Sequence, residues 1–448
     1  MRALFRHEYR LLVRDHAFVA ATVLFAVLTV FAVANGARWL EQRRASIAGE
    51  RAQNEQLASA TVAPTRLEQR AVFDPAPAAA LAVGRGDLDP FTSRVTMLTG
   101  RHKLFSQWQL ANPLTLLAGR FDLAFLIVYL FPLLIVALTY NVLSSEREQG
   151  TLVMVLSQPV RLRALLAAKI GVRGLAVLAA AGIVTAAASF FVIDFNAPGA
   201  WTALAAWLAA TALYGAFWFG LSLWVNAAGR SSATNAVALI TIWVGLVVVA
   251  PVLLNLGVAA VHPLPSRLAL LQSTRAIENE TSRAATRLLD RFYSDHPELV
   301  PAADRMHYLR SGYAVRQEQE RRLLPEVLAY ERQLRAQQGA IDRWRFASPA
   351  VLTSEVLAGI AGNDRTRFLA WQDAVRAFVV QWRERLLADY YLGRPMTPAK
   401  TRALPQFRFE EPPHGGAALS ASLAGLLAMS LLAAGAGFVA LRRYPIAG

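Results

Sequence analysis

Two histidines stand among several carboxylates between residues 295 and 307, and such side chains could bind a metal ion. They are His296 and His307, with Asp295, Glu298 and Asp304 nearby. Imidazole nitrogens and carboxylate oxygens are ligands of zinc. Their spacing does not place them on one face of a helix, and the chain has no cysteine to add thiolates. We therefore expect no metal site and no cofactor bound by this chain.

The sequence motifs of nucleotide binding and of hydrolysis are missing. No Gly-x-x-x-x-Gly-Lys-Ser/Thr loop, no His-Glu-x-x-His and no Gly-x-Ser-x-Gly occurs in the chain. The nearest serine motif, Gly220–Trp224, lacks the second glycine and lies in an apolar run. Any ATP must therefore be bound by another subunit, because a phosphate-binding loop needs its glycines and lysine. An intramembrane enzyme is a poor interpretation for the same lack of a catalytic constellation.

The most informative stretch runs from Ser144 to Lys169 and reads SSEREQGTLVMVLSQPVRLRALLAAK. It begins with acidic residues, continues through Gly150 into the apolar run Leu152–Leu156, breaks at Pro159 and ends with basic residues. This order predicts a short amphipathic helix, a turn and a return to apolar sequence. A helix of this kind can dock into a groove on a partner protein.

The composition indicates a membrane protein in which these residues are positioned by apolar helices. Of 448 residues, 55% are hydrophobic and only 17% are charged, and the apolar residues gather in long blocks. The net charge is +15, but the chain has no basic tract and no interleaving of basic and aromatic residues of the kind found in nucleic-acid modules. Contact with lipid headgroups is the simpler explanation, and we expect no nucleic-acid partner.

Six blocks are long enough to cross a bilayer. A helix rises ~1.5 Å per residue, so about twenty apolar residues span the hydrocarbon core. The predicted fold class is all-α, a polytopic membrane protein with six transmembrane helices, and a kink is expected at Pro251. The expected segments are 1–36 (interfacial helix and first span), 37–121 (outer segment), 122–143 (second span), 144–169 (linking helix and turn), 170–193 (third span), 201–226 (fourth span), 232–261 (fifth span), 262–415 (large outer helical domain), 416–441 (sixth span) and 442–448 (tail).

Basic residues in the short loops set the expected orientation, because Lys and Arg are enriched on the cytoplasmic side. With the N-terminus inside, that side carries the N-terminal arginines, Arg147 and Arg230, whereas the short loop Asp194–Ala200 on the other side has none. Both termini are therefore expected in the cytoplasm. No convincing cleavage site follows the first apolar block, so we expect it to be an uncleaved span.

Four arginines before the first span, Arg2, Arg6, Arg10 and Arg14, recur every four residues beside apolar residues. This pattern suits a helix lying in the plane of the membrane interface. A plain cytoplasmic extension of the first span, with arginines that set its orientation, is the alternative.

The two outer segments read mainly as helices. Residues 37–57 would prolong the first span as a charged helix, and Asp74–Ala82 looks like a Pro- and Ala-rich linker. Helices are expected at 303–345, with a break before Pro325, and at 365–392. Mixed charges on the helical runs indicate solvated surfaces.

A set of residues after the second span resembles the ABC-2 type transporter permease family, whose members carry Glu-x-Glu-x-Gly-Thr-Leu, then Leu-Ser-x-Pro-Val and a lysine. The matching residues are Glu146, Glu148, Gly150, Thr151, Leu152, Leu156, Ser157, Pro159, Val160 and Lys169. The chain looks like the subset with a large outer helical domain, related to the permease of nitrous-oxide reductase maturation and to gliding-motility permeases. The resemblance covers the six spans, and the outer domain departs from the compact members of the family.

The resemblance implies a multi-pass permease subunit of the bacterial inner membrane. Its cytoplasmic coupling helix would sit on a separate ABC ATPase subunit that binds ATP, and a second permease copy or a related permease would complete the pathway. The residues expected to transmit ATPase movement are Glu146, Arg147, Glu148, Gly150, Thr151, Leu152, Leu156, Ser157, Pro159 and Arg161.

Polar and aromatic residues in the spans could line a pathway or pack helices together. They are Tyr140, Asn141, Tyr214, Trp218 and Asn235. The expected function is ATP-driven export or work on a periplasmic partner. The alternative is a membrane-anchored periplasmic scaffold without transport, in which the outer domain binds a partner and the spans only hold it.

Overall fold

The computed structural model describes residues 2–100, 104, 120–150, 162–228, 230–264, 266–301, 307–411 and 415–442. Six helical stretches in this part of the chain are long and apolar enough to cross a membrane, which confirms the predicted all-α polytopic fold. The spans are α2 (His16–Ser59), α4 (Leu123–Phe125) through α5 (Phe131–Thr139), α8 (Leu162–Ser189), α9 (Ala200–Asn226), α10 (Ser232–Trp243) with α11 (Ala250–Val261), and α18 (Gly415–Leu441). The second helical stretch continues after a turn into the short helix α6 (Ser144–Glu148).

The remaining elements precede the first span or lie in the two outer segments. They are α1 (Arg2–Arg14), β1 (Glu68–Val72), η1 (Gly84–Asp87), β2 (Thr92–Thr96), α12 (Arg267–Arg283), α13 (Ala285–Asp295), η5 (Pro297–Leu299), α14 (His307–Trp344), η6 (Arg345–Ala347), α15 (Pro349–Ala361), α16 (Arg365–Tyr391) and α17 (Pro398–Arg402). The hairpin of β1 and β2, with Glu68 opposite Thr96, was not expected from the sequence.

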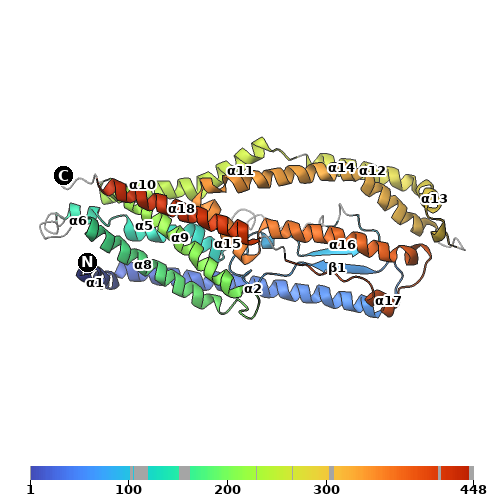
Figure 1. Ribbon diagram of the computed structural model, residues 1–448, viewed down its shortest axis with the longest axis horizontal. Coiled ribbons are helices and arrows are strands. Elements are labelled where there is room, and N and C mark those ends of the chain that lie inside the picture. Colours follow the sequence, from blue (N-terminus) through green and yellow to red (C-terminus); the bar gives the residue numbers. More distant parts are fainter. Residues whose placement is uncertain are drawn as a thin grey trace.

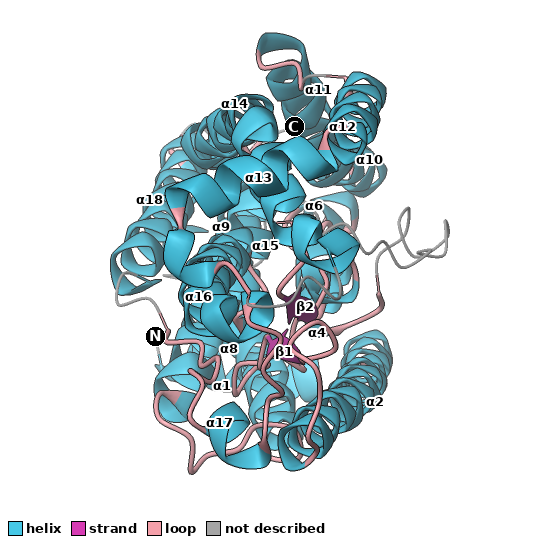
Figure 2. Ribbon diagram, turned by 90° about the vertical axis from the view of Figure 1, so that its right-hand side faces the viewer, coloured by secondary structure: helices cyan, strands magenta, loops and turns pink. Residues whose placement is uncertain are grey.

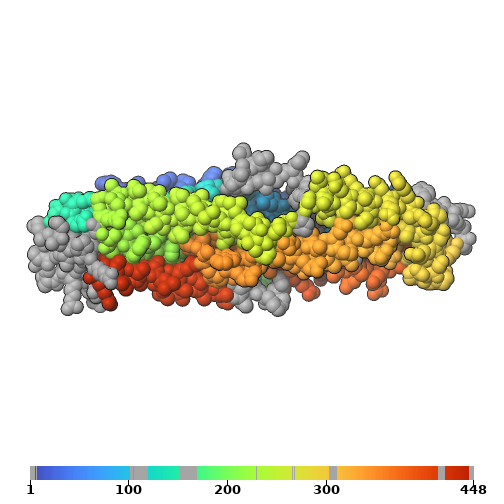
Figure 3. Space-filling view, turned by 90° about the horizontal axis from the view of Figure 1, so that it is seen from above, coloured from blue at the N-terminus to red at the C-terminus, as the bar shows by residue number. Residues whose placement is uncertain are grey.

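The molecule is elongated (Figure 1). Both chain ends and α6 lie at one end, and α13 and α17 lie at the other. Seen along its length, the molecule encloses the β hairpin with helices, α2 and α16 among them (Figure 2). The helices α12 and α14 continue the face formed by α10 and α11 beyond the spans (Figure 3). The spans and the outer segments therefore form two consecutive parts of one long body.

The helix α2 runs without a break from the first span into the outer part of the molecule. Its 44 residues confirm the predicted extension beyond residue 37. At Gly36 the backbone of residues 78–83 comes so close that a Cβ atom would lie 1.9 Å from the carbonyl oxygen of Ala80. The expected linker Asp74–Ala82 is thus wrong in its second half, because Ala78–Val83 are at most 1% exposed.

Two proline-containing spans change their winding just before the proline. The π-helical segments η3 (Leu126–Leu130) and η4 (Val244–Val249) precede Pro132 and Pro251. Proline has no N–H, so a carbonyl one turn earlier loses its helical partner. Other elements supply a donor in each case: Tyr214 Oη donates to Val128 O at 2.9 Å, and Ser348 Oγ donates to Leu246 O at 2.7 Å.

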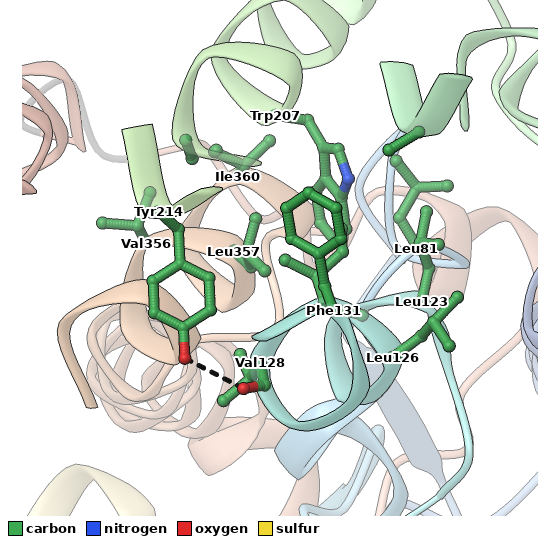
Figure 4. Packing of buried hydrophobic residues seen from close by; sticks show 14 of the residues in the cluster. Leu81, Leu123, Leu126, Val128, Phe131, Trp207, Tyr214, Val356, Leu357 and Ile360 are labelled. Carbon is green, nitrogen blue, oxygen red and sulfur yellow. Dashed lines mark hydrogen bonds between the residues drawn. The ribbon is translucent and has the colours of Figure 1, made fainter. Parts of the chain in front are cut away.

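The apolar core of the bundle includes a helix from the outer segment. Leu352, Val356 and Leu357 of α15 are at most 3% exposed and pack in the same cluster as Phe131 and Trp207 of the spans. Figure 4 shows Val356 and Leu357 of α15 beside Phe131 of α5 and Trp207 of α9. The segment 262–415 therefore contributes to the bundle core, although the sequence placed it wholly outside.

The outer part has its own core, in which α16 is central. Trp371, Val375 and Trp382 of α16 are at most 1% exposed and pack with residues of the hairpin and of α13. The helices α12 and α14 pair through Gln319 Nε2, which donates to Thr281 Oγ1 at 2.9 Å. The predicted break before Pro325 is wrong, because α14 continues through this proline. The predicted helix at 365–392 is confirmed by α16.

Candidate coupling site

The linking segment begins directly after the second span. Tyr140–Leu143 form a turn, α6 covers Ser144–Glu148, and Gly150 adopts a positive φ of 71°. This left-handed conformation suits glycine because it has no Cβ. The remaining predicted coupling residues, Thr151, Leu152, Leu156, Ser157, Pro159 and Arg161, lie outside the described residues.

Glu148 is bonded to the start of the fifth span. Its carboxylate oxygens accept hydrogen bonds from Ser232 N at 2.7 Å and from Ser232 Oγ at 2.9 Å. Free N–H groups at a helix start favour a negative charge. The neighbouring Ser231 is the N-cap of α10 and accepts from Thr234 N at 3.3 Å. The second glutamate of the motif therefore holds α6 to α10.

Glu146 is directed to a different pair of elements. It forms an ion pair with Lys169 of α8, whose Nζ also lies 3.9 Å from Glu8 Oε1 of α1. Lys169 is only 8% exposed, so its charge needs these partners. Close by, Arg173 donates from Nη1 to Leu138 O at 2.7 Å at the end of the second span. These contacts join α6 to α1 and α8.

A series of hydrogen bonds, partly exposed at Ser232 and buried beyond it, continues from α6 into the bundle. Ser144 Oγ lies 2.8 Å from Ser232 Oγ, and Asn235 Nδ2 lies 3.5 Å from Ser144 Oγ and from Asn226 Oδ1. Asn226 Nδ2 donates to Thr139 O at 3.0 Å. Such buried groups are stabilised mainly by pairing with one another. These hydrogen bonds join the second, fourth and fifth spans.

The predicted pathway residues occupy different environments. Asn235 belongs to the hydrogen-bonded chain and is fully buried. Tyr214 and Trp218 are also fully buried, and Tyr214 is bonded to Val128 O of the second span. Tyr140 and Asn141 are half-buried at the turn before α6. The structure thus brings Asn235 to the candidate coupling segment and places Tyr214 and Trp218 in the bundle core. That any of the three lines a pathway stays a prediction.

Several residues of the site were not assigned a role from the sequence. Ser144 and Ser232 carry no motif of their own, and Glu8 was noted only as an acid among arginines. The signal for Glu8 was its position: it is a single carboxylate in the middle of a basic amphipathic helix, opposite the arginines. Among the residues that the structure describes, no group of three His, Cys, Asp or Glu side chains is placed to hold a metal ion.

The fold and this site define a polytopic membrane protein with a short helix clamped between its spans. The sequence matches the family described as ABC-2 family transporter protein over residues 2–375, and the chain belongs to this family. It is thus a membrane component of an ABC transporter, a class that works with an ABC ATPase subunit. No curated protein matches the sequence.

Proposed function

We propose that the chain is the permease subunit of a bacterial inner-membrane ABC transporter, with both termini in the cytoplasm. A separate ATPase binds and hydrolyses ATP, and its closure moves the segment 144–169. One observation supports this proposal above the others: the two motif glutamates tie α6 to different spans. Glu148 is bonded to Ser232 at the start of α10, and Glu146 is paired with Lys169 of α8.

These contacts give the segment a way to act on the bundle. The helix α6 is bonded to the ends of two spans. When closure of the ATPase moves this helix, both ends are displaced together, because packed helices move as rigid bodies. Arg147 and Gly150 belong to this moving unit. The apolar run from Leu152 to Leu156 is proposed to enter a groove of the ATPase.

The work that follows is proposed to be export of a substrate or movement of a periplasmic partner. A second copy of the chain, or a related permease, would complete the pathway, and residues such as Tyr140 and Asn141 would then face it. The outer domain extends well beyond the spans (Figure 1), which suits contact with a periplasmic partner.

Co-purification tests the proposal. A tagged chain, expressed with the ATPase genes of its source, should recover a P-loop ATPase from detergent extracts. Leu156→Asp should lose the ATPase, because a charge in the apolar run costs several kcal/mol to bury. Glu148→Gln should still recover it but should lower ATP-dependent protection of the segment from proteolysis.

The matched control is Leu324→Asp, an equivalent change at a residue of the outer domain that is 42% exposed. It should recover the ATPase as the natural chain does. Recovery of no ATPase with the natural chain would contradict the proposal. In a further variant the order of residues 151–161 is scrambled. If this variant keeps the activity of the natural chain in cells, the membrane-anchored scaffold is favoured instead.

A further inference from the structure

The helix α1 presents two different faces. Glu8 and Leu12, one turn apart, are 8% and 5% exposed and face the bundle, where α1 packs on α8 and α2. Arg6, Arg10 and Arg14 are exposed. Successive residues turn by about 100° around a helix, so Arg10 lies about 200° from Glu8 and the arginines form a stripe opposite the buried face.

Apolar side chains flank this arginine stripe. Tyr9 is 58% exposed and Val13 is 52% exposed, and both lie between the buried face and the arginines. Leu11, which is 51% exposed, lies on the other flank. Arginines with apolar neighbours on the outer side of a helix are typical of a helix that lies in a membrane interface, with its apolar residues in the acyl boundary and its charges at the headgroups.

The connection to the first span keeps α1 at the membrane surface. Only Asp15, which is the N-cap of α2, separates Arg14 from the helix that crosses the membrane. A stripe of three cations at this position complements a bilayer with anionic headgroups, which attracts each basic residue near it. An acidic protein would match the charge, but it would leave Tyr9 and Val13 without an apolar environment.

The buried face of α1 leads to the coupling segment. Glu8 Oε1 lies 3.9 Å from Lys169 Nζ, and the same lysine is paired with Glu146 of α6. Lys169 is buried, and breaking one partner of a buried ion pair is costly. A change in the position of α1 is therefore felt at α6 through Lys169, which is shared by Glu8 and Glu146.

We propose that α1 binds anionic phospholipid headgroups and that this contact restrains α6 through Glu8 and Lys169. Anionic lipid then regulates how freely the coupling segment moves. The placement of α1 on the cytoplasmic side rests on the proposed function, whereas the lipid contact and the link to α6 rest on the contacts above.

Amide hydrogen exchange of the full chain in lipid nanodiscs tests both steps. One set contains phosphatidylcholine alone, and the other also contains phosphatidylglycerol. We expect phosphatidylglycerol to slow exchange more than about tenfold in residues 2–14 and several-fold in 144–150, since three arginines face the lipid. A high salt concentration should reduce the effect by screening these charges.

Three variants separate the steps. Replacing Arg6, Arg10 and Arg14 by Gln should abolish the lipid effect in both segments. Glu8→Gln should keep the effect in α1 and lose it in 144–150, and Lys169→Gln should do the same. Exchange in α16, far from α1 in the outer core, reports whether each variant is folded.

The control variant replaces Arg283, Arg287 and Arg291 by Gln. These three arginines are also exposed and four residues apart, but they lie in the outer domain. Their replacement should leave the effect of phosphatidylglycerol on hydrogen exchange unchanged. Equal exchange of residues 2–14 in both lipids would overturn the lipid contact, and protection of α1 without protection of 144–150 would overturn the link. Hydrogen exchange of the two segments is measured without an ATPase. Failure to recover an ATPase by co-purification would therefore leave this inference standing.

Discussion

The phenol of Tyr214 on α9 donates a hydrogen bond of 2.9 Å to the carbonyl oxygen of Val128, four residues before Pro132. The dashed line in Figure 4 marks this bond within the apolar core. A proline in a span removes one helical hydrogen bond, and a bare carbonyl in this environment is unfavourable. The tyrosine on a neighbouring span makes the proline tolerable.

Replacing Tyr214 by Phe should lower the free energy of unfolding by about 1–3 kcal/mol, because it leaves a buried acceptor without its donor. Thermal unfolding in detergent, followed by tryptophan fluorescence, measures the change. Tyr129→Phe is the matched control, since Tyr129 lies in the same turn as Val128 and is 37% exposed. Equal losses in the two variants would contradict a specific role for Tyr214.

Replacing Gly36 by Ala should destabilise the chain by about 1–3 kcal/mol, which is the usual cost of forcing an extra methyl group into a packed site. The new Cβ would lie 1.9 Å from Ala80 O, and the backbone must shift to relieve this contact. Gly49→Ala on the same helix is the control, because nothing lies within 4 Å of its Cβ position. That control should be neutral or slightly stabilising, as alanine favours helices; a neutral Gly36→Ala would show that residues 78–83 pack differently.

The helix α14 should lose stability in acid. Hydrogen bonds from Arg321 and then from Arg322 lower the pKa of Glu318 to about 2. A lowered carboxylate pKa stabilises the folded state above the unfolded value near 4.5, and this contribution is lost as the pH falls from about 4.5 towards 2. Hydrogen exchange of α14 at several pH values measures it. Glu318→Gln should flatten the dependence, while Glu326→Gln, on the same helix, should keep it.

The spans could be predicted from the sequence because their signal is local. A run of about twenty apolar residues is sufficient to identify a membrane helix. The helix α15 was not recognised because its 13 residues are too few to span, and only the tertiary structure shows that Leu352 and Leu357 enter the bundle core. Residues 78–83 were missed for a similar reason, since an alanine-rich segment reads as a linker unless Gly36 is seen beside it.

In the candidate site, too, the local sequence signal was predictable and the tertiary contacts were not. The motif located the candidate coupling segment, but it could not show which way its carboxylates point. Glu146 and Glu148 were expected to transmit ATPase movement, and that role stays a prediction. The structure directs their carboxylates to other parts of the same chain, Lys169 and Ser232. Ion pairs between residues far apart in the sequence, such as Glu8 with Lys169, depend on how the helices pack. No pattern along one chain specifies that packing.

The unbroken course of α2 has a mechanical consequence. A helix of 44 residues is about 66 Å long at ~1.5 Å per residue. If it tilts as a stiff rod by about 5° around its inner end, its outer end moves by about 6 Å, as follows from this length. Rearrangements too small to open the packed spans would in this way displace the outer part of the protein by more than the width of a peptide group.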